Sequence, residues 1–202
     1  MTRFARAGAM AALLAMTAGC SSTVASGRPP ARMPARAGIF SALPSACSLV
    51  NPATLQTLNL KAEPNEQTNA QRGGVREKRC AWGSPAGGHG GSRSLVVIAD
   101  LFTPATGQAP ATAAEEQFQE NTSDQAQADG SRGHAVSGLA NEAFTDEVTR
   151  SPYSQSQVTV RDQNVLVTVN YGAMAANSGS NAVSAADQGA LTAARAVLSA
   201  LS

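Results

Sequence analysis

A valine-rich segment around residue 160 constrains the fold more than any other feature. Residues 157–161 and 165–171 alternate apolar and polar side chains, which is the period of a half-buried strand. Only residues 162–164 link the two runs, so the two runs are predicted to pair as a β-hairpin. Every second residue from Val165 to Tyr171 would share one face, and this fixes the strand register. Asn164 is expected to adopt the left-handed conformation that a short link often needs.

The rest of the chain adds helices and further strands to this hairpin. Asn51 and Pro52 are a favoured N-cap and first residue of a helix, whereas 61–74 is polar and reads as a loop. Residues 134–148 contain an expected turn at Gly138. The sequence therefore predicts an α+β fold: one antiparallel sheet of about four to five strands, with helices packed on one face. The predicted helices span 52–60, 112–128 and 185–201, and the other predicted strands span 76–82 and 94–102.

Two apolar features in these elements allow a structural or a functional interpretation. Cys80 and Trp82 would share a face of their strand because side chains alternate. Packing of Trp82 in the core is favoured over a ligand platform, since buried aromatic residues dominate core energetics. The terminal helix has an apolar stripe, and packing of this stripe on the sheet is favoured over partner binding. The stripe comprises Leu191, Ala194, Leu198 and Leu201.

The N-terminus has the pattern of an export signal. Arg3 and Arg6 precede an apolar run over 7–18, which suits a signal peptide better than a membrane span. Small residues then lead to Cys20 and resemble the lipobox of bacterial lipoproteins, although Thr17 stands where leucine is usual. We expect a signal peptide over 1–19 and a Cys20 thiol that carries lipid, with acyl groups such as palmitate. The alternative is an ordinary secretory signal that is cut after Ala25.

The residues after Cys20 divide into a tether and a domain. Residues 20–38 are small, polar and rich in proline, so they cannot bury enough apolar surface to fold. We expect this stretch to be a flexible spacer between the lipid and an extracytoplasmic domain over 39–202. The cell membrane, reached through the N-terminal lipid, is the predicted location.

The three cysteines fit this location. Exported thiols pair in an oxidising compartment, and Cys47 with Cys80 would form a disulfide that leaves Cys20 for the lipid. Closing this loop would stabilise the fold by about 4 kcal/mol on the chain-entropy model. The alternative is that Cys47 and Cys80 are two free buried thiols.

Charge excludes one class of partner. The chain has 15 basic and 14 acidic residues, and 13 basic residues remain when Arg3 and Arg6 are removed with the signal. A nearly neutral chain has no basic footprint for nucleic acid. It also lacks the polybasic cluster that strengthens contact with anionic lipid.

No motif indicates catalysis, a cofactor or a metal. The glycine-rich stretch over 83–93 matches neither nucleotide-binding spacing, and His89 in it has no partners spaced for a metal. A hydrolase is the least favoured class because no G-x-S-x-G occurs. The carboxylate pairs at 115–116 and 146–147 are expected to be solvated. The Asn141-Glu142 pair is expected to cap a short helix rather than to act chemically.

Three short motifs resemble a known family. CSL at 47–49, CAW at 80–82 and VSGLANEAF at 136–144 are similar to motifs of actinobacterial lipoproteins that carry a widespread domain of unknown function. The sequence departs from that pattern at Ala140-Asn141, where Gly-Asp is commoner. The resemblance implies a cell-surface lipoprotein with a disulfide and an α+β sheet domain, and it brings no catalytic residues.

The sequence therefore favours a non-catalytic binding module at the cell surface, not an enzyme. Its ligand would be a small or apolar molecule or a component of the cell envelope. The alternative is a regulatory or structural partner of a membrane protein complex, because a tether raises effective concentration. The residues that contact a ligand are not specified by any motif.

Overall fold

The structure is a computed structural model of the chain. It describes residues 39–60, 64–68, 71–84, 92–104, 107–128, 132–150, 153–174 and 180–202. The predicted signal peptide, Cys20 and the tether lie outside the described residues, as does His89. The described helices are η1 (Ala46–Ser48), α1 (Pro52–Thr57), α2 (Pro110–Gln127) and α3 (Ser180–Leu201), and the strands are β1 (Asn65–Thr68), β2 (Val75–Gly83), β3 (Arg93–Phe102), β4 (His134–Ala135), β5 (Glu142–Arg150), β6 (Tyr153–Asp162) and β7 (Val165–Met174).

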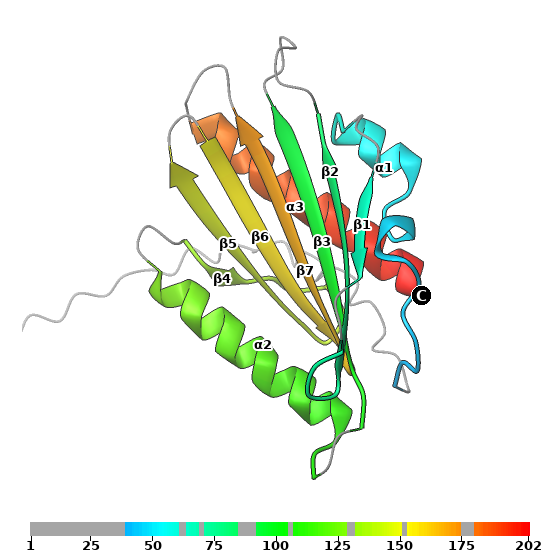
Figure 1. Cartoon of the computed structure of the whole chain (residues 1–202). Helices are drawn as coiled ribbons and strands as arrows, with labels where there is room; N and C mark the ends of the chain where they lie inside the picture. Colours follow the sequence, from blue (N-terminus) through cyan, green and yellow to red (C-terminus); the bar gives the residue numbers. More distant parts are fainter. Residues whose placement is uncertain are drawn as a thin grey trace, which may run out of the picture.

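The described strands form one antiparallel sheet in the order β1-β2-β3-β7-β6-β5-β4 (Figure 1). A single antiparallel sheet with helices is therefore confirmed. The expected number of strands was too low, because the sheet has six strands of four residues or more and the two-residue β4. The 61–74 segment was predicted to be a loop but contains β1, and the turn region 134–148 contains most of β5. Backbone pairing to β2 makes β1 a strand although its sequence, NEQT, has no apolar alternation.

The predicted hairpin is confirmed as β6 and β7, with Val158 opposite Val169. Its connection is one residue shorter than expected, because Asp162 pairs with Val165 and belongs to β6. The left-handed residue of the turn is Gln163, with φ of 57°. The expectation that Asn164 would adopt this conformation was therefore wrong.

Asn164 has a different role, which depends on its side chain. It is 1% exposed, and its Oδ1 accepts a hydrogen bond from the Phe40 backbone N–H at 2.7 Å. Its Nδ2 donates to the carbonyls of Phe40 at 3.0 Å and Phe102 at 2.8 Å. The turn therefore binds both the start of the described domain and the end of β3.

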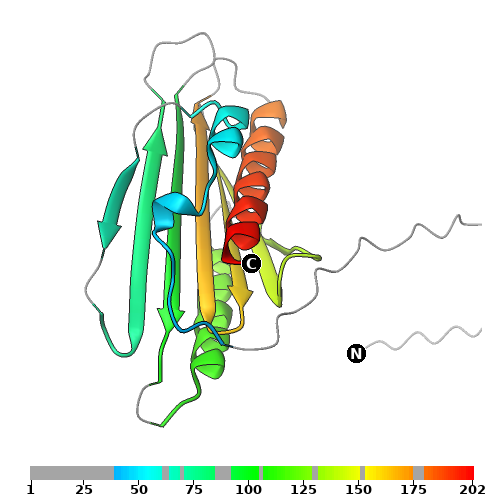
Figure 2. The same cartoon turned by 90° about the vertical axis from the view of Figure 1, so that its right-hand side faces the viewer.

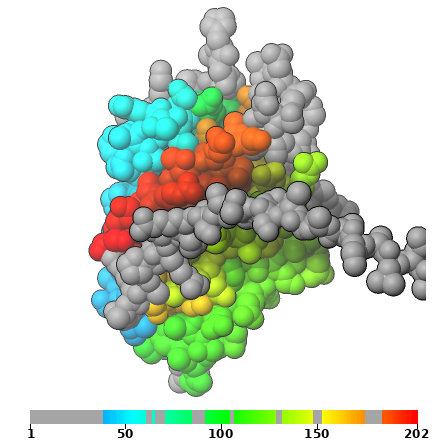
Figure 3. Space-filling model, turned by 180° about the vertical axis from the view of Figure 1, so that it is seen from behind, coloured from blue at the N-terminus to red at the C-terminus, as the bar shows by residue number. Residues whose placement is uncertain are grey.

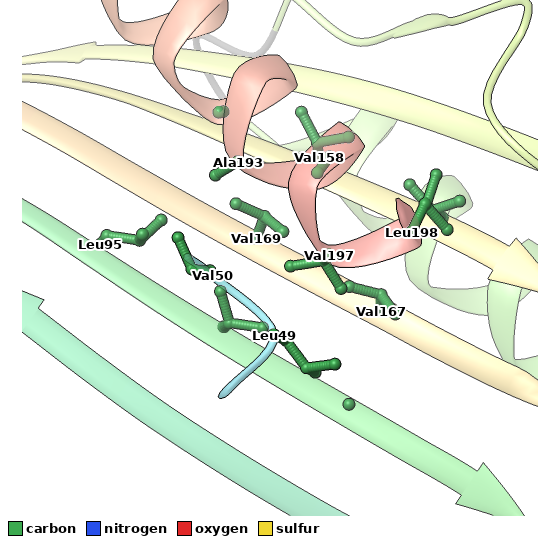
Figure 4. Packing of buried hydrophobic residues seen from close by; sticks show 14 of the residues in the cluster. Leu49, Val50, Leu95, Val158, Val167, Val169, Ala193, Val197 and Leu198 are labelled. Atoms are coloured by element: carbon green, nitrogen blue, oxygen red, sulfur yellow. The ribbon is translucent and has the colours of Figure 1, made fainter. Parts of the chain in front are cut away.

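The larger core lies on the sheet face that α3 covers, and α1 and η1 lie on the same side (Figure 2). Strands β6 and β7 direct every second residue into this core, so the alternation predicted for the hairpin is confirmed. Strand β3 does the same with residues 95, 97, 99 and 101. Figure 4 shows side chains of α3 meeting those of the strands and of the segment after η1. The labelled core residues are Leu49, Val50, Leu95, Val158, Val167, Val169, Ala193, Val197 and Leu198.

The second face of the sheet carries α2, which corrects the prediction that all helices pack on one face. Ala114 and Phe118 of α2 are buried against Leu166 and Phe102. Leu166 points away from α3, because its neighbours in β7 face the larger core. Figure 1 shows α3 crossing behind the strands and α2 at their lower ends. The placement of α2 was not predicted because the alternating pattern of the hairpin shows only which face of the sheet is more apolar. It does not show whether a helix also covers the other face.

The segment from η1 to α1 is fixed to the sheet by local capping and by one covalent bond. Asn51 caps α1 as predicted, because its Oδ1 accepts from the Thr54 N–H at 2.8 Å. Cys47, in η1, forms the predicted disulfide with Cys80 of β2, with a Cα–Cα distance of 5.2 Å. Within the described ranges, no helix has the length and apolar character needed to cross a bilayer.

Candidate functional site

A cavity of about 230 Å³ lies on the α3 side of the sheet, where the end of α1 approaches the first half of α3. The two helices lie side by side on this face (Figures 2 and 3). The adjacent strands β3 and β7 form the base of the cavity. They do so where the first residue of β3, Arg93, pairs with Ala173 near the end of β7. The lining residues are Thr57, Leu58, Arg93, Tyr171, Ala173, Ala185, Gln188, Gly189 and Thr192.

The α3 wall of the cavity follows from helical spacing. Residues 185, 188, 189 and 192 recur at intervals of three and four, so they share one face of the helix. Gly189 lies against the sheet: a Cβ at this position would be 2.5 Å from two carbons of the Tyr171 ring. Because glycine has no side chain, α3 can lie directly on the tyrosine ring, which forms the base beside Gly189.

Arg93 and Tyr171 bind the same backbone oxygen at the end of α1. Arg93 Nη1 donates to the Leu58 carbonyl at 3.2 Å, and the Tyr171 hydroxyl donates to the same oxygen at 3.2 Å. The last carbonyls of a helix have no partner within the helix, so these two bonds satisfy one of them. They also hold α1 against the sheet and bring a guanidinium to the cavity wall.

Arg93 is the one charged side chain among the described residues that line the cavity. Burial raises the pKa of the Tyr171 hydroxyl, and the charge of Arg93 and its hydrogen bond to Tyr171 oppose this effect. An ion pair between two described residues, Arg161 and Glu142, at 2.6 Å lies at a different place in the sheet. Among those residues, no carboxylate is within ion-pair distance of Arg93.

A second polar cluster joins α3 to the strands on its other flank. Thr145 of β5 donates to Asp187 Oδ1 at 2.9 Å, and Ser156 of β6 donates to the same oxygen at 3.3 Å. Glu147 is nearby, and its pKa is raised chiefly by burial and then by the charge of Asp187. In this cluster Asp187 accepts hydrogen bonds from two hydroxyl groups, which attach α3 to the sheet.

The third polar site is a carboxylate pair on the α2 face of the sheet. Asp100 of β3 is directly opposite Glu77 of β2. Burial, reinforced by the charge of Glu77, raises the pKa of Asp100 from 3.8 to about 6. In the described residues, no group of three or more histidine, cysteine, aspartate or glutamate side chains is arranged to hold a metal ion.

Two interpretations of polar residue pairs in the sequence were wrong. Asn141 does not cap a helix: it precedes β5, and its Oδ1 accepts from the Gln163 N–H at 2.7 Å. The 146–147 pair does not lie on a solvated helix or turn, because both residues are in β5 and Asp146 is 6% exposed. Both errors arose because β5 was missed.

The other predicted positions are consistent with structural roles. Trp82 is 3% exposed and belongs to the same core as Cys80, as the packing interpretation required. Its indole Nε1 is buried and has no hydrogen-bond partner within the described part of the chain. Trp82 does not line the cavity.

Sequence reasoning did not identify the residues that line the cavity. Arg93 appeared as the last residue of a glycine-rich loop, and Tyr171 only as a marker of strand register. One available signal was Gly189, since an isolated glycine inside a helical pattern usually has a packing reason. Which side chains meet across α1, β3, β7 and α3 depends on how the helices lie on the sheet, and no short motif encodes this.

Compared with known proteins, the chain matches no family model, no curated protein and no solved structure.

Proposed function

We propose that this chain is a lipid-anchored, non-catalytic binding module that holds a small ligand in the cavity between α1, α3 and the sheet. The observation that carries the proposal is the composition of the cavity walls. A guanidinium, two threonines and a glutamine stand among apolar and small residues in about 230 Å³. Ligand sites have this combination of mostly apolar walls and a few polar groups that orient the ligand.

The size of the cavity favours a small molecule. Sites for drug-sized ligands occupy roughly 300–1,000 Å³, and this cavity is smaller. The charge of Arg93 makes a wholly apolar ligand unfavourable, because such a ligand would remove water from the guanidinium without replacing its hydrogen bonds. A small ligand with a polar head and a short apolar part fits best.

The proposed anchor places this domain at the extracytoplasmic face of the cell membrane. Lipid on Cys20 and a tether over 20–38 would keep the binding site close to the bilayer and to the envelope. The resemblance to actinobacterial lipoproteins, in the CSL, CAW and VSGLANEAF motifs, supports this location. The disulfide also supports it, because disulfides persist in oxidising compartments.

Native mass spectrometry of the full chain, produced with export and kept non-reduced, tests the proposal. We expect the native mass to exceed the denatured mass by that of a co-purified small molecule. Ala185→Leu is the matched variant: Ala185 lines the cavity from an exposed helical position, so leucine should fill the space without disturbing the core. The extra mass should disappear in this variant.

If neither native mass spectrometry nor a thermal-shift screen of small metabolites detects binding, the proposal is wrong. The second function considered from the sequence, a tethered partner of a membrane protein complex, would then be tested by crosslinking in the membrane.

A further inference from the structure

We infer that the cavity binds a small monocarboxylate and that Arg93 pairs with the carboxylate group. This inference rests on the proposed function, since it names the chemical class of the ligand for the same cavity. It depends on three features of the described residues: the hydrogen-bonding capacity of Arg93, the position of the nearest carboxylate on α3, and the chemistry of the surrounding walls.

Arg93 has donors available for a ligand. A guanidinium carries five N–H donors in a planar fork. One of them binds the Leu58 carbonyl and another interacts with the Tyr171 oxygen. These partners are neutral, so they hold the side chain in place without neutralising its charge. A guanidinium fixed in this way is prepared for a carboxylate, which accepts two parallel hydrogen bonds from such a fork.

The acidic residue of α3 makes its hydrogen bonds away from the cavity. Asp187 precedes Gln188 in α3, but its Oδ1 accepts from Thr145 and Ser156 on the β5–β6 flank. The helix therefore directs its carboxylate away from the cavity and presents an amide, a glycine and a hydroxyl to it. Among the described residues that line the cavity, one side chain is cationic and none is anionic.

One cation selects a singly charged ligand. A phosphate carries up to two charges at neutral pH, and neutralising it in a partly enclosed site requires more than one cation. A carboxylate carries one charge and matches a single arginine. Thr57, Gln188 and Thr192 can contact a hydroxyl or amino group on the ligand. Leu58 and Ala173 offer apolar surface to a short carbon chain.

The test uses butanoate and its neutral counterpart butanamide as probes, with the full chain labelled for backbone amide NMR. We expect butanoate to shift the signals of residues 171–173 and 185–192, and butanamide to bind at least tenfold more weakly. Arg93→Lys should retain weakened binding, because lysine keeps the charge and loses the fork. Arg93→Gln should abolish the preference for butanoate. Arg79→Gln is the control, since it removes the same charge from the opposite face of the sheet.

Arg93 also holds α1, so Arg93→Gln can lose binding through a folding defect as well as through loss of the guanidinium. Ala185→Leu distinguishes the two causes, because it leaves both hydrogen bonds to the Leu58 carbonyl intact and should also block butanoate. Equal binding of butanoate and butanamide in the cavity would overturn the inference and leave the proposed function standing. Butanoate shifts that survive both Arg93→Gln and Ala185→Leu would place the anion elsewhere and also overturn it. If butanoate does not bind and the native protein carries no small molecule, both the inference and the proposed function fail.

Discussion

Gly189 of α3 lies on the ring of Tyr171 so closely that a Cβ at position 189 would come within 2.5 Å of ring carbons Cδ1 and Cε1. We therefore expect Gly189→Ala to destabilise the fold. Alanine gains about 1 kcal/mol in helix propensity, but overpacking costs about 1–3 kcal/mol, since α3 must move off the ring or the ring must move into the cavity. Urea unfolding should show a net loss of up to about 2 kcal/mol.

The mechanism is checked by a second substitution at the same contact. Tyr171→Leu removes the ring and should itself be destabilising, but Gly189→Ala should cost less in that background. Ser199→Ala, at an exposed position of the same helix, should change the free energy of unfolding by less than about 0.5 kcal/mol. A stabilised Gly189→Ala protein would show that helix propensity outweighs the contact with Tyr171.

Adjacent residues of the β6–β7 turn should respond in opposite directions. Asn164→Ala removes the side chain that bonds to Phe40 and Phe102. It takes one donor from the buried Phe102 carbonyl and two hydrogen bonds from the partly buried Phe40 backbone, so we expect a loss of about 2–4 kcal/mol. Gln163→Gly relieves a positive φ of 57° and should stabilise by about 0.5–1 kcal/mol. Thermal unfolding of both variants measures the contrast, and changes of the same sign would contradict these assignments.

Elements with strong periodic patterns could be predicted from the sequence. The β6–β7 hairpin has alternating valines, α1 has an asparagine cap followed by proline, and α3 has an apolar stripe. The disulfide followed from the number of cysteines and the expected compartment. In each case the determining signal is local or depends on very few residues.

The parts that were missed depend on tertiary context. β1 has a polar sequence and becomes a strand by pairing with β2. The position of α2 on the second face is determined by Phe118 and Ala114 packing against Leu166, and neither partner reveals the other in the sequence. The cavity is still harder to predict from the sequence. Arg93 and Gly189 line the same cavity only after α3 has packed on the sheet.

Loss of the Cys47–Cys80 disulfide should strongly reduce stability. The bond joins residues 33 apart in sequence, and for a loop of this size the chain-entropy model gives about 4 kcal/mol. A Cys47→Ala/Cys80→Ala double variant should therefore unfold at a much lower urea concentration. The wild-type chain with reductant should move towards the same midpoint, and equal midpoints with and without reductant would show that the bond contributes little.

The proposed lipidation of Cys20 can be tested independently of the fold. We expect the wild-type chain, produced in an actinobacterial host, to fractionate with membranes and to incorporate labelled palmitate. Cys20→Ala should lose the label and leave the membrane fraction, because the proposal makes this thiol the acceptor of the lipid. Cys47→Ala is a suitable control, since it should keep the label. A Cys20→Ala protein that remains labelled and membrane-bound would refute the assignment.

Asp100 should make stability depend on pH in the acidic range. Burial and the opposed Glu77 raise its pKa from 3.8 to about 6, so the folded state holds this proton more tightly than the unfolded state does. Linkage then requires the contribution of Asp100 to stability to fall as pH rises from about 4 to 6 and to stay low above 6. Asp100→Asn mimics the neutral acid and should stabilise by about 1–2 kcal/mol at pH 7, after allowance for partial exposure.

The signature of this effect is the difference between two unfolding curves measured at a series of pH values. Wild type and Asp100→Asn should have similar free energies of unfolding near pH 4 and diverge as the pH rises to 6. Glu115→Gln, on the exposed side of α2, changes the same charge and should follow the wild type throughout. A constant difference between wild type and Asp100→Asn would assign the gain to packing, because only a shifted pKa makes that difference depend on pH.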